Sequence, residues 1–437
     1  MVISYVGFVG AFISSVVVSR LLGVEGKGIF SLFMATISGL WMVAALGVPQ
    51  GQLYHASKHP QWLSHFMANA VPFSVLIGGV VGLTYFLGGH ALGFEAVDAL
   101  PWPVPLVGVV CIPAGVLLIY QRQYFLGLQR YELSKASGAV SLTLPLLGYV
   151  GVYLLGYAGM APFASAYVAA QLVCFAVFQI AARRIGPAPG GFSRELARRS
   201  FGFGSRQLAS DIALYLMQRL DFFIVMLYLG AKGLGIYSVA VGLAEILVRL
   251  SNEIGSMLFA IFATGNLKTG QPAAALRLLT LVTVGVAGLL GLISGPLVRT
   301  LFGQAFADAA PAFRWLLVGT VAWSTTNVTW YYISAAGRPQ LGVFVFGLAA
   351  GVDVLLNVLL LPHLGVTGAS IAATTSYVVA ALIFLHYFRT LEACSLREAF
   401  VANSSDCRQL WRAVRGASGR LGRVAAGSVT RSLGPHE

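Results

Sequence analysis

The sequence predicts an all-α integral membrane protein with about 12 transmembrane helices, arranged as two parallel six-helix lobes around a central cleft. Three observations lead to this prediction. The composition is strongly apolar, the apolar runs are long enough to cross a bilayer, and one short motif recurs half a chain later.

The composition is that of a chain whose main solvent is lipid. Of the 437 residues, 57% are hydrophobic and only 10% are charged, and the mean hydropathy is +0.81. A soluble domain carries charge on about a quarter of its residues, so a surface this apolar must largely face a bilayer. The alternating ten-residue segments of an outer-membrane barrel do not occur in the sequence, which favours helices.

Several apolar runs of about 17 to 22 residues can each cross the roughly 30 Å hydrocarbon core as a helix. Gly and Pro interrupt some of them, which membrane helices tolerate. We expect six spans in each half of the chain, near residues 2–19, 29–48, 66–87, 104–120, 139–155 and 162–182, and near 208–228, 235–262, 279–298, 313–334, 341–361 and 366–388.

The basic residues predict the orientation. The net charge is +13, and most of the 28 lysines and arginines fall in alternate loops and in the C-terminal tail, on one side of the predicted membrane. The positive-inside rule places that side, and both termini, in the cytoplasm. Arg122 belongs to an inner loop in this assignment. Lys27 and Arg20 fall on the outer side, where we expect Arg20 to snorkel to headgroups. Because orientation and anionic lipid account for the charge, we expect no nucleic-acid partner.

The longest predicted loop divides the spans into two sets of six. It is basic and contains Pro187 and Pro189. We therefore divide the chain into an N-terminal six-helix lobe at 1–186, a basic cytoplasmic linker at 187–206, a C-terminal six-helix lobe at 207–389 and a basic cytoplasmic tail at 390–437.

The two halves of the chain repeat each other. The stretch LGVEGKGIFSL at 22–32 reappears as LGAKGLGIYSV at 229–239, and two further pairs follow at nearly the same offset: 125–130 with 333–338, and 155–159 with 364–368. Each pair falls in an equivalent loop, which indicates an internal repeat. Since each half has an even number of spans, the repeat is parallel, and the lobes should face each other across a cleft where substrates bind.

The repeated turn also carries a family resemblance. With the stretch RLDFFIVMLYLGAKGLGIYSVA at 219–240, it resembles the polysaccharide flippase branch of the multidrug/oligosaccharidyl-lipid/polysaccharide exporter superfamily. The resemblance covers essentially residues 1–390. It implies a carrier in the bacterial inner membrane that moves undecaprenyl-pyrophosphate-linked oligosaccharide from the inner to the outer leaflet. Related branches flip a lipid-linked peptidoglycan precursor or export drugs by cation antiport.

Ionisable residues at membrane depth concentrate in the second half. In the eighth span a polar stripe follows one helix face over about five turns. Such a stripe is too costly to face lipid, so it should face the cleft or another helix. In the first half the equivalent positions are neutral, so we expect the site in the second lobe. The stripe consists of Ser238, Gly242, Glu245, Arg249, Asn252 and Ser256.

These residues suggest two chemical roles. A pyrophosphate-linked glycan needs fixed cations for its phosphates and amide or aromatic groups for its sugars, and a surplus carboxylate in a low-dielectric cleft can carry a proton or bind Na⁺. The candidate coupling residues are Asp221, Glu245, Asp353 and Asp211. The candidate substrate-binding residues are Arg219, Arg249, Asn252, Asn327, Tyr331 and Asn357. We expect no metal site and no cofactor beyond a coupling H⁺ or Na⁺.

Alternatives remain open at this point. Glu245, Arg249 and Glu253 are spaced for i, i+4 pairing and could form a static ion-pair network, and Asp221 could simply anchor the fold. A cation-coupled multidrug or small-solute exporter and a membrane-embedded glycan-modifying enzyme are alternative functions. Expected partners are the lipid-linked glycan and the bilayer, with a polysaccharide polymerase or glycosyltransferase as candidates, and we expect a functional monomer.

Overall fold

The computed structural model describes residues 2–91, 102–157, 159–188, 190–262, 271–338 and 340–392, together with 395 and 400. Almost all of the predicted tail at 390–437 therefore lies outside the described residues. All regular secondary structure in the described part is helical.

The first half of the chain forms α1 (Val2–Ala45), α2 (Val48–Lys58), the short 3₁₀ helix η1 (Pro60–Trp62), α3 (Leu63–Ala91), α5 (Val104–Gly127), α6 (Tyr131–Leu154) and α7 (Met160–Ile185). The second half forms α8 (Arg194–Phe262), α9 (Gln271–Phe302), η2 (Gln304–Phe306), α10 (Ala309–Ala335), α11 (Gln340–Leu364) and α12 (Val366–Glu392).

Nine helical stretches of the described chain are long and apolar enough to cross a membrane. Two of them, in α1 and α8, are kinked, and each supplies two of the expected spans. The remaining expected span is α10, whose hydropathy is lowered by many Thr, Ser and Asn side chains. All twelve predicted spans thus have a helical counterpart, and the chain is a multi-pass membrane protein.

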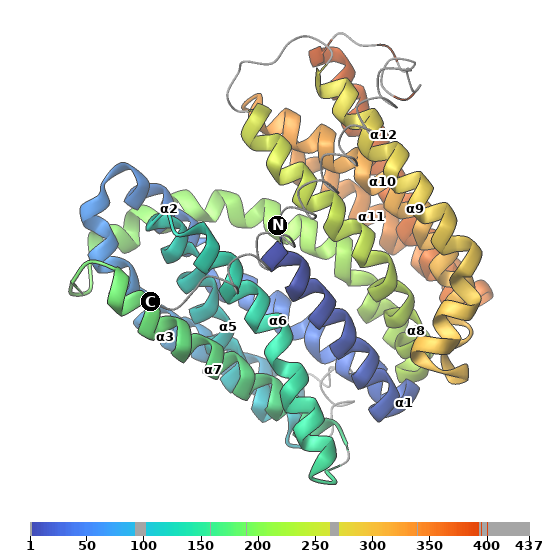
Figure 1. Cartoon of the computed structure of the whole chain (residues 1–437), viewed down its shortest axis with the longest axis horizontal. Helices are drawn as coiled ribbons and strands as arrows, with labels where there is room; N and C mark the ends of the chain where they lie inside the picture. Colours follow the sequence, from blue (N-terminus) through green and yellow to red (C-terminus); the bar gives the residue numbers. More distant parts are fainter. Residues whose placement is uncertain are drawn as a thin grey trace, which may run out of the picture.

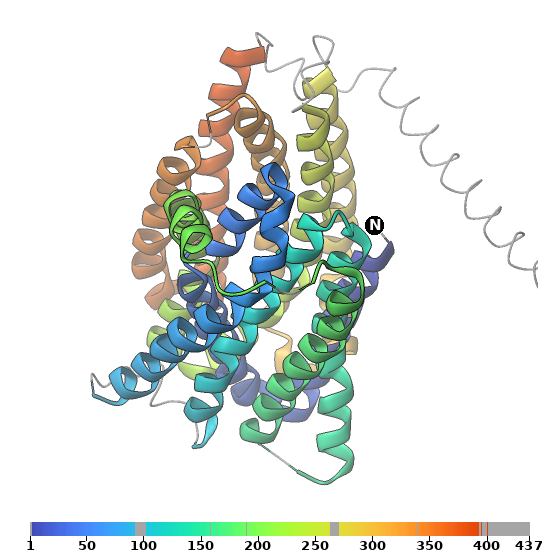
Figure 2. The same ribbon diagram turned by 90° about the vertical axis from the view of Figure 1, so that its left-hand side faces the viewer.

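The helices form two bundles that diverge from each other (Figure 1). The first bundle contains α1 to α7, and the second contains α9 to α12 with the later part of α8. Turned by 90°, the first-half helices lie in front of the second-half helices (Figure 2). The bundles meet chiefly where α1 packs along α8. The predicted two-lobe architecture is confirmed.

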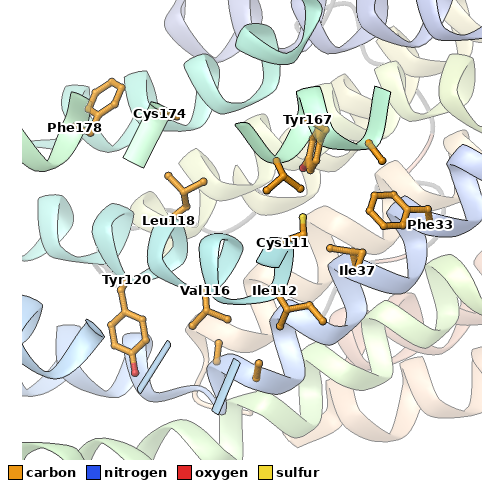
Figure 3. Close-up of a cluster of buried hydrophobic side chains, with 14 of the residues drawn as sticks. Phe33, Ile37, Cys111, Ile112, Val116, Leu118, Tyr120, Tyr167, Cys174 and Phe178 are labelled. Atoms are coloured by element: carbon orange, nitrogen blue, oxygen red, sulfur yellow. The ribbon is translucent and has the colours of Figure 1, made fainter. Parts of the chain in front are cut away.

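Each lobe has its own apolar core. In the first lobe, side chains of α1, α5 and α7 pack around Cys111, Ile112 and Val116 of α5 (Figure 3). Cys111 and Cys174 are buried free thiols, as their apolar sequence surroundings predict. Leu32 and Ala35 of α1 join a core otherwise built from α8 to α12, so α1 packs into both lobes.

The backbone confirms the internal repeat. Within α1 only Gly23 departs from helical geometry, with φ 69° and ψ −171°. Within α8 only Gly230, its repeat equivalent, does so, with φ 64° and ψ −171°. This left-handed geometry is strained for residues with a Cβ. The loops predicted within the repeated stretches 22–32 and 229–239 are therefore single-residue breaks, and the helix resumes at once after each glycine.

The other two repeated loops match in the same way. Gln129 and Gly337 both have positive φ, at 58° and 81°, and both follow a helix end. Gly156 and Gly365, in the third pair of loops, also have positive φ, at 76° and 56°. The sequence similarity between the halves therefore reflects equivalent helix endings.

The two copies of the repeated turn pack directly on each other. A Cβ atom on Gly28 would lie 1.9 Å from the carbonyl oxygen of Ala231, and one on Gly235 would lie 2.0 Å from that of Val24. Because Val24 and Ala231 are equivalent in the repeat, the contact is reciprocal, as across a two-fold axis. It holds the lobes together at the end where α1 and α8 are kinked.

Arg20 strengthens the same end of the interface. Its Nε donates to the carbonyl oxygen of Leu301 at 2.7 Å, and its Nη2 donates to that of Thr300. These carbonyls belong to the last turn of α9, where a cation is favourable. The exposed Arg20 therefore has partners at the end of a second-lobe helix that the sequence did not reveal.

This reciprocal contact yields a prediction. The change Gly28→Ala should lower the melting temperature of the purified protein, since overpacking costs about 1–3 kcal/mol and the clash is with backbone. The matched control is Gly79→Ala in α3, where a Cβ would meet nothing within 4 Å. There the gain in helix propensity should leave stability unchanged or raised. Equal melting temperatures for the two variants would show that the turns do not hold the lobes together.

The predicted linker at 187–206 is partly helical. After α7 ends at Ile185, α8 already begins at Arg194, and its first turn is capped by Ser193, whose Oγ accepts the N–H of Leu196 at 3.3 Å. A Cβ on Gly204 would lie 2.0 Å from the carbonyl oxygen of Gly47. The helix before position 207 therefore packs against the first lobe through its backbone.

Candidate functional site

The kink in α8 brings its charged residues together. Arg219 and Asp221 lie shortly before Gly230, whereas Tyr237 and Glu245 lie after it. All four line one cavity of about 210 Å³. A straight helix would place Arg219 and Glu245 about 39 Å apart, so the single-residue break is what builds the site.

Glu245 is shared by two arginines. Its Oε1 accepts a bond from Nη2 of Arg219, and its Oε2 accepts one from Nη2 of Arg249 at 3.1 Å. The two guanidinium groups also lie over aromatic rings, Arg219 over Phe222 at 5.2 Å and Arg249 over Phe8 at 5.3 Å. Phe8 belongs to α1, so the cluster reaches the boundary between the lobes. Within the described part of the chain the bonds to Glu245 are the side-chain hydrogen bonds of the two arginines, which leaves further N–H donors for a ligand.

The polar stripe of α8 faces inward, as predicted. Glu245, Arg249 and Asn252 all line the cavity, and Ser238 is buried with its hydroxyl donating to the carbonyl oxygen of Gly235. The expected Glu245–Arg249 pair is present. Glu253 also pairs across the lobes, with Nζ of Lys135 in α6 at 3.8 Å. The side chain of Ser256 lies outside the described residues.

A second cavity of about 490 Å³ lies between α1, α8 and α9. Glu245 and Arg249 form its polar side, and Ser15 of α1 adds a hydroxyl. The rest of its lining is mostly apolar and consists of Tyr5, Phe8, Val9, Ala11, Phe12, Gly242, Ile246, Leu247, Leu250, Val286 and Leu290. The cluster around Glu245 therefore separates a small polar cavity within the second lobe from a larger apolar one between the lobes.

Lys27 is a buried cation that the sequence assignment missed. It was expected in an outer loop, but it lies in α1 one turn after Gly23 and is only 7% exposed. Its Nζ donates to Oγ of Ser15 at 3.0 Å, and its charge interacts with that of Glu245. No described carboxylate lies within 4.0 Å of it. The first lobe is thus not neutral at the site, because it contributes this ammonium group.

Two carboxylates lie deeper in the second lobe. Oδ1 of Asp221 accepts the backbone N–H of Phe222 at 2.8 Å, and its Oδ2 accepts the hydroxyl of Tyr237. Asp353 of α11 is 1% exposed, and in the described part of the chain neither carboxylate oxygen accepts a hydrogen bond of good geometry, although the amide of Asn357 lies beside it. The charges of Asp221 and Asp353 are close enough to interact.

Asn357 lies one turn after Asp353 and is fully buried. Its Nδ2 donates to the backbone carbonyl of Asp353 at 2.9 Å, and its Oδ1 accepts no hydrogen bond from the residues that the structure describes. Buried carboxylate and amide oxygens without donors are costly. A proton or a hard cation with oxygen ligands satisfies such a group.

The candidate asparagine and tyrosine side chains lie in different environments. Oδ1 of Asn252 accepts bonds from Nδ2 of Asn327 and from Nε1 of Trp323, the latter at 3.1 Å. Asn252 lines the cavity, and Asn327 holds the Asn252 side chain in place through this hydrogen bond. Tyr331 lies instead beside Gly255, where a Cβ would meet its ring at 2.6 Å. Asp211, on α8 ahead of the charged cluster, lines neither cavity.

Arg122 also lies inside a helix rather than in the expected inner loop. It belongs to α5, and its Nη2 donates to Oγ of Ser141 in α6. Its Nε is buried and has no hydrogen-bond partner among the described residues. Since Ser141 also binds Gln171 of α7 through its backbone carbonyl, Arg122 belongs to the interior of the first lobe and not to the cluster around Glu245.

Comparison with known families and relatives agrees with this fold. Residues 1–265 match the family described as polysaccharide biosynthesis protein. Over 196 residues the chain is 24% identical to the uncharacterized membrane protein MJ1068 of Methanocaldococcus jannaschii, a match covering 43% of this chain and 38% of that relative's length. It is 21% identical over 381 residues to the probable low-salt glycan biosynthesis flippase Agl15 of Haloferax volcanii, covering 84% of this chain and 78% of the relative.

Solved structures share the fold at low identity. The lipid II flippase MurJ in an inward closed conformation has a TM-score of 0.75 at 10% identity, covering 91% of this chain and 88% of that one. The inward-facing structure of a multidrug resistance MATE family transporter of the MOP superfamily has a TM-score of 0.71 at 14% identity. This match covers 89% of this chain and 94% of that one. An outward-facing MATE structure scores 0.62 at 15% identity, covering 90% and 94%.

Proposed function

Because this chain belongs to the polysaccharide biosynthesis protein family, we propose that it flips a lipid-linked oligosaccharide across the membrane for surface polysaccharide assembly. The proposed cargo is an undecaprenyl-pyrophosphate-linked glycan moving from the inner to the outer leaflet of a bacterial inner membrane. The named glycan flippase relative, which is archaeal, supports the cargo class. The observation that carries the proposal is the excess of cations around Glu245, where Arg219, Arg249 and Lys27 stand against the two carboxylates of Glu245 and Asp221.

Three cations lie around Glu245, and Asp221, a second carboxylate of the same cavity, compensates one of them. Arg219 and Arg249 bind the two oxygens of Glu245, and the charge of Lys27 interacts with this carboxylate from the first lobe. An uncompensated charge at membrane depth is costly unless a ligand neutralises it. A pyrophosphate supplies the missing negative charge and accepts several N–H bonds, for which guanidinium groups are well shaped. Glu245 holds the two arginines in place until the cargo arrives.

The neighbouring cavity suits the rest of such a molecule. Its apolar lining borders the charged cluster directly, at Glu245 and Arg249. A lipid-linked pyrophosphate is a strong anion attached to a hydrocarbon chain, so it needs a cationic site beside an apolar one. Asn252, on the opposite side of the cluster, offers its amide to the sugar hydroxyls. An exporter of organic cations would instead need an excess of acidic side chains at its site, with no buried arginine or lysine among them.

We place ion coupling at the deeper carboxylate pair. Asp221 and Asp353 are both buried, and neither carboxylate oxygen of Asp353 accepts a hydrogen bond of good geometry from the described residues. When the lobes rearrange, a proton or Na⁺ taken up there from one side can be released to the other. Because Asp221 and Arg219 line the same cavity, a change in the charge at Asp221 acts directly on the cargo site.

Alternating access requires the reciprocal turn contact to open. The two turns close one end of the molecule at Gly28 and Gly235, the end that the charge distribution predicts to be outer. The higher TM-score with inward-facing than with outward-facing relatives supports an inward-facing state. In the outward-facing state the kinked ends of α1 and α8 would separate, releasing Arg20 from α9.

A deletion strain tests the function. Without the gene, we expect loss of surface polysaccharide and accumulation of the lipid-linked unit in the inner leaflet, both restored by the wild-type chain. Normal polysaccharide together with raised sensitivity to cationic drugs would favour the multidrug exporter instead. A chemically altered glycan with normal leaflet distribution would favour the membrane-embedded enzyme. The same strain shows whether a polymerase or glycosyltransferase copurifies with the protein, which we propose acts as a monomer.

A further inference from the structure

A groove of about 590 Å³ runs along the second lobe between α9, α10 and α12, and Phe400, which follows α12 in the chain, also lines it. Its lining is almost entirely apolar, and α9 contributes Gly288 and Gly291 to it. A Cβ on Gly288 would meet nothing within 4 Å. Glycines on membrane helices normally permit close helix packing, whereas this one borders open space. Because residue 288 has no side chain, the groove has room there for a bound molecule.

One end of the groove is cationic. Arg314 of α10 reaches across it, and its Nε donates to Oγ of Ser294 in α9 at 2.7 Å. The described residues place no carboxylate within 4.0 Å of Arg314, so its other N–H donors have no anionic partner. Arg299, in the last turn of α9, adds a second cation near this end of the helix pair. The groove thus combines a long apolar channel with a basic terminus.

Its dimensions fit a hydrocarbon chain. From Ser294 beside Arg314 to Thr280 at the other end, α9 rises about 21 Å. This exceeds the roughly 15 Å of one leaflet's hydrocarbon, so an extended acyl chain can lie in the groove with its headgroup at the arginine. We propose that an anionic glycerophospholipid of the surrounding bilayer binds this groove, with its phosphate on Arg314.

The position of the groove favours a bilayer lipid over the transported molecule. Thr320 of α10 and Tyr377 of α12 line the charged cavity, whereas Val321 and Val378, the residues that follow them, line the groove. Two helices therefore separate the groove from the proposed cargo site. The lipid supports α10 and α12 from behind and so fixes the wall of the cavity. This binding does not depend on the proposed transport function.

Thermal unfolding with added lipid tests the proposal. Phosphatidylglycerol should raise the melting temperature of the full chain in detergent by roughly 3 °C or more above the effect of phosphatidylcholine. The variants Arg314→Gln and Gly288→Leu should each remove most of that difference, the first by losing the phosphate contact and the second by filling the groove. The control Arg338→Gln changes an exposed arginine beyond the other end of α10 and should keep it.

The outcomes separate the alternatives. Equal stabilisation by the two lipids in the wild-type chain would overturn the proposal, as would an undiminished phosphatidylglycerol effect in both groove variants. Stabilisation by undecaprenyl phosphate alone, lost in Arg314→Gln, would assign the groove to the polyprenyl chain and reject the bilayer phospholipid. If Arg314→Gln does not fold, Gly288→Leu decides the question, since it leaves the Arg314–Ser294 bond in place.

Discussion

The change Arg249→Gln is expected to reduce transport about 30- to 150-fold while leaving the protein in the membrane at its normal level. Arg249 donates one bond to Glu245, whose other oxygen remains paired with Arg219 in the variant. The fold therefore keeps a paired carboxylate, but the cargo loses one phosphate ligand. Removing one partner of a hydrogen-bonded charge pair costs about 2–3 kcal/mol at such sites, which corresponds to this loss.

Two measurements distinguish a cargo site from the static ion-pair network. The transport rate of the lipid-linked glycan into proteoliposomes gives function per molecule, and the melting temperature gives stability. A purely structural role predicts a lower melting temperature and an unchanged rate per folded molecule. The conservative variant Arg249→Lys keeps the charge without the planar fork, and we expect it to recover only part of the rate. Arg338→Gln, far from the cluster, serves as the matched control.

Lys27 offers an independent check on the same site. If its ammonium group contributes to the phosphate site, Lys27→Met should also slow transport although it lies in the other lobe. Its repeat equivalent is Leu234, which is fully buried, so an apolar residue is compatible with this place in the fold. Retention of the full rate by Lys27→Met would restrict the phosphate site to the two arginines of α8.

Much of the architecture could be predicted from the sequence because the repeat and the apolar runs reflect strong physical constraints. Gly23 and Gly230 recur since both copies of the turn need the same left-handed backbone. The stripe containing Glu245 and Arg249 was visible because a charged helix face cannot face lipid. The sequence pattern of one helix does not show which neighbouring helix supplies the partner of each charged residue, because that depends on the tertiary fold.

The errors have identifiable causes. Lys27 was assigned to a loop because glycines flank it, but Gly28 serves the close approach to Ala231 rather than a loop. The sequence does not show whether a glycine forms a loop or permits a close approach between two helices. The helix at the start of α8 was missed although Ser193, followed by an acidic residue in the first turn, is a recognisable cap.

The buried carboxylate of Asp353 accepts no hydrogen bond of good geometry from the described residues. If a coupling ion neutralises it, Asp353→Asn should make the protein as stable without Na⁺ as with it, because the costly buried charge is gone. Transport should then lose its dependence on the ion gradient, by about 5- to 150-fold if the coupling free energy is typical. Melting temperatures with and without Na⁺, and at two pH values, distinguish Na⁺ from H⁺.

Asp211→Asn is the matched control for this experiment. Asp211 was an equally plausible coupling residue by sequence, on the same α8 helix as Asp221, yet it lines neither cavity. We expect this variant to keep both the ion-dependent stabilisation and the gradient dependence. The reverse result, with Asp353→Asn unaffected and Asp211→Asn uncoupled, would move the coupling site to the start of α8. The coupling ion would then have to act on Arg219 and Arg249 along α8 rather than through the buried carboxylates Asp221 and Asp353.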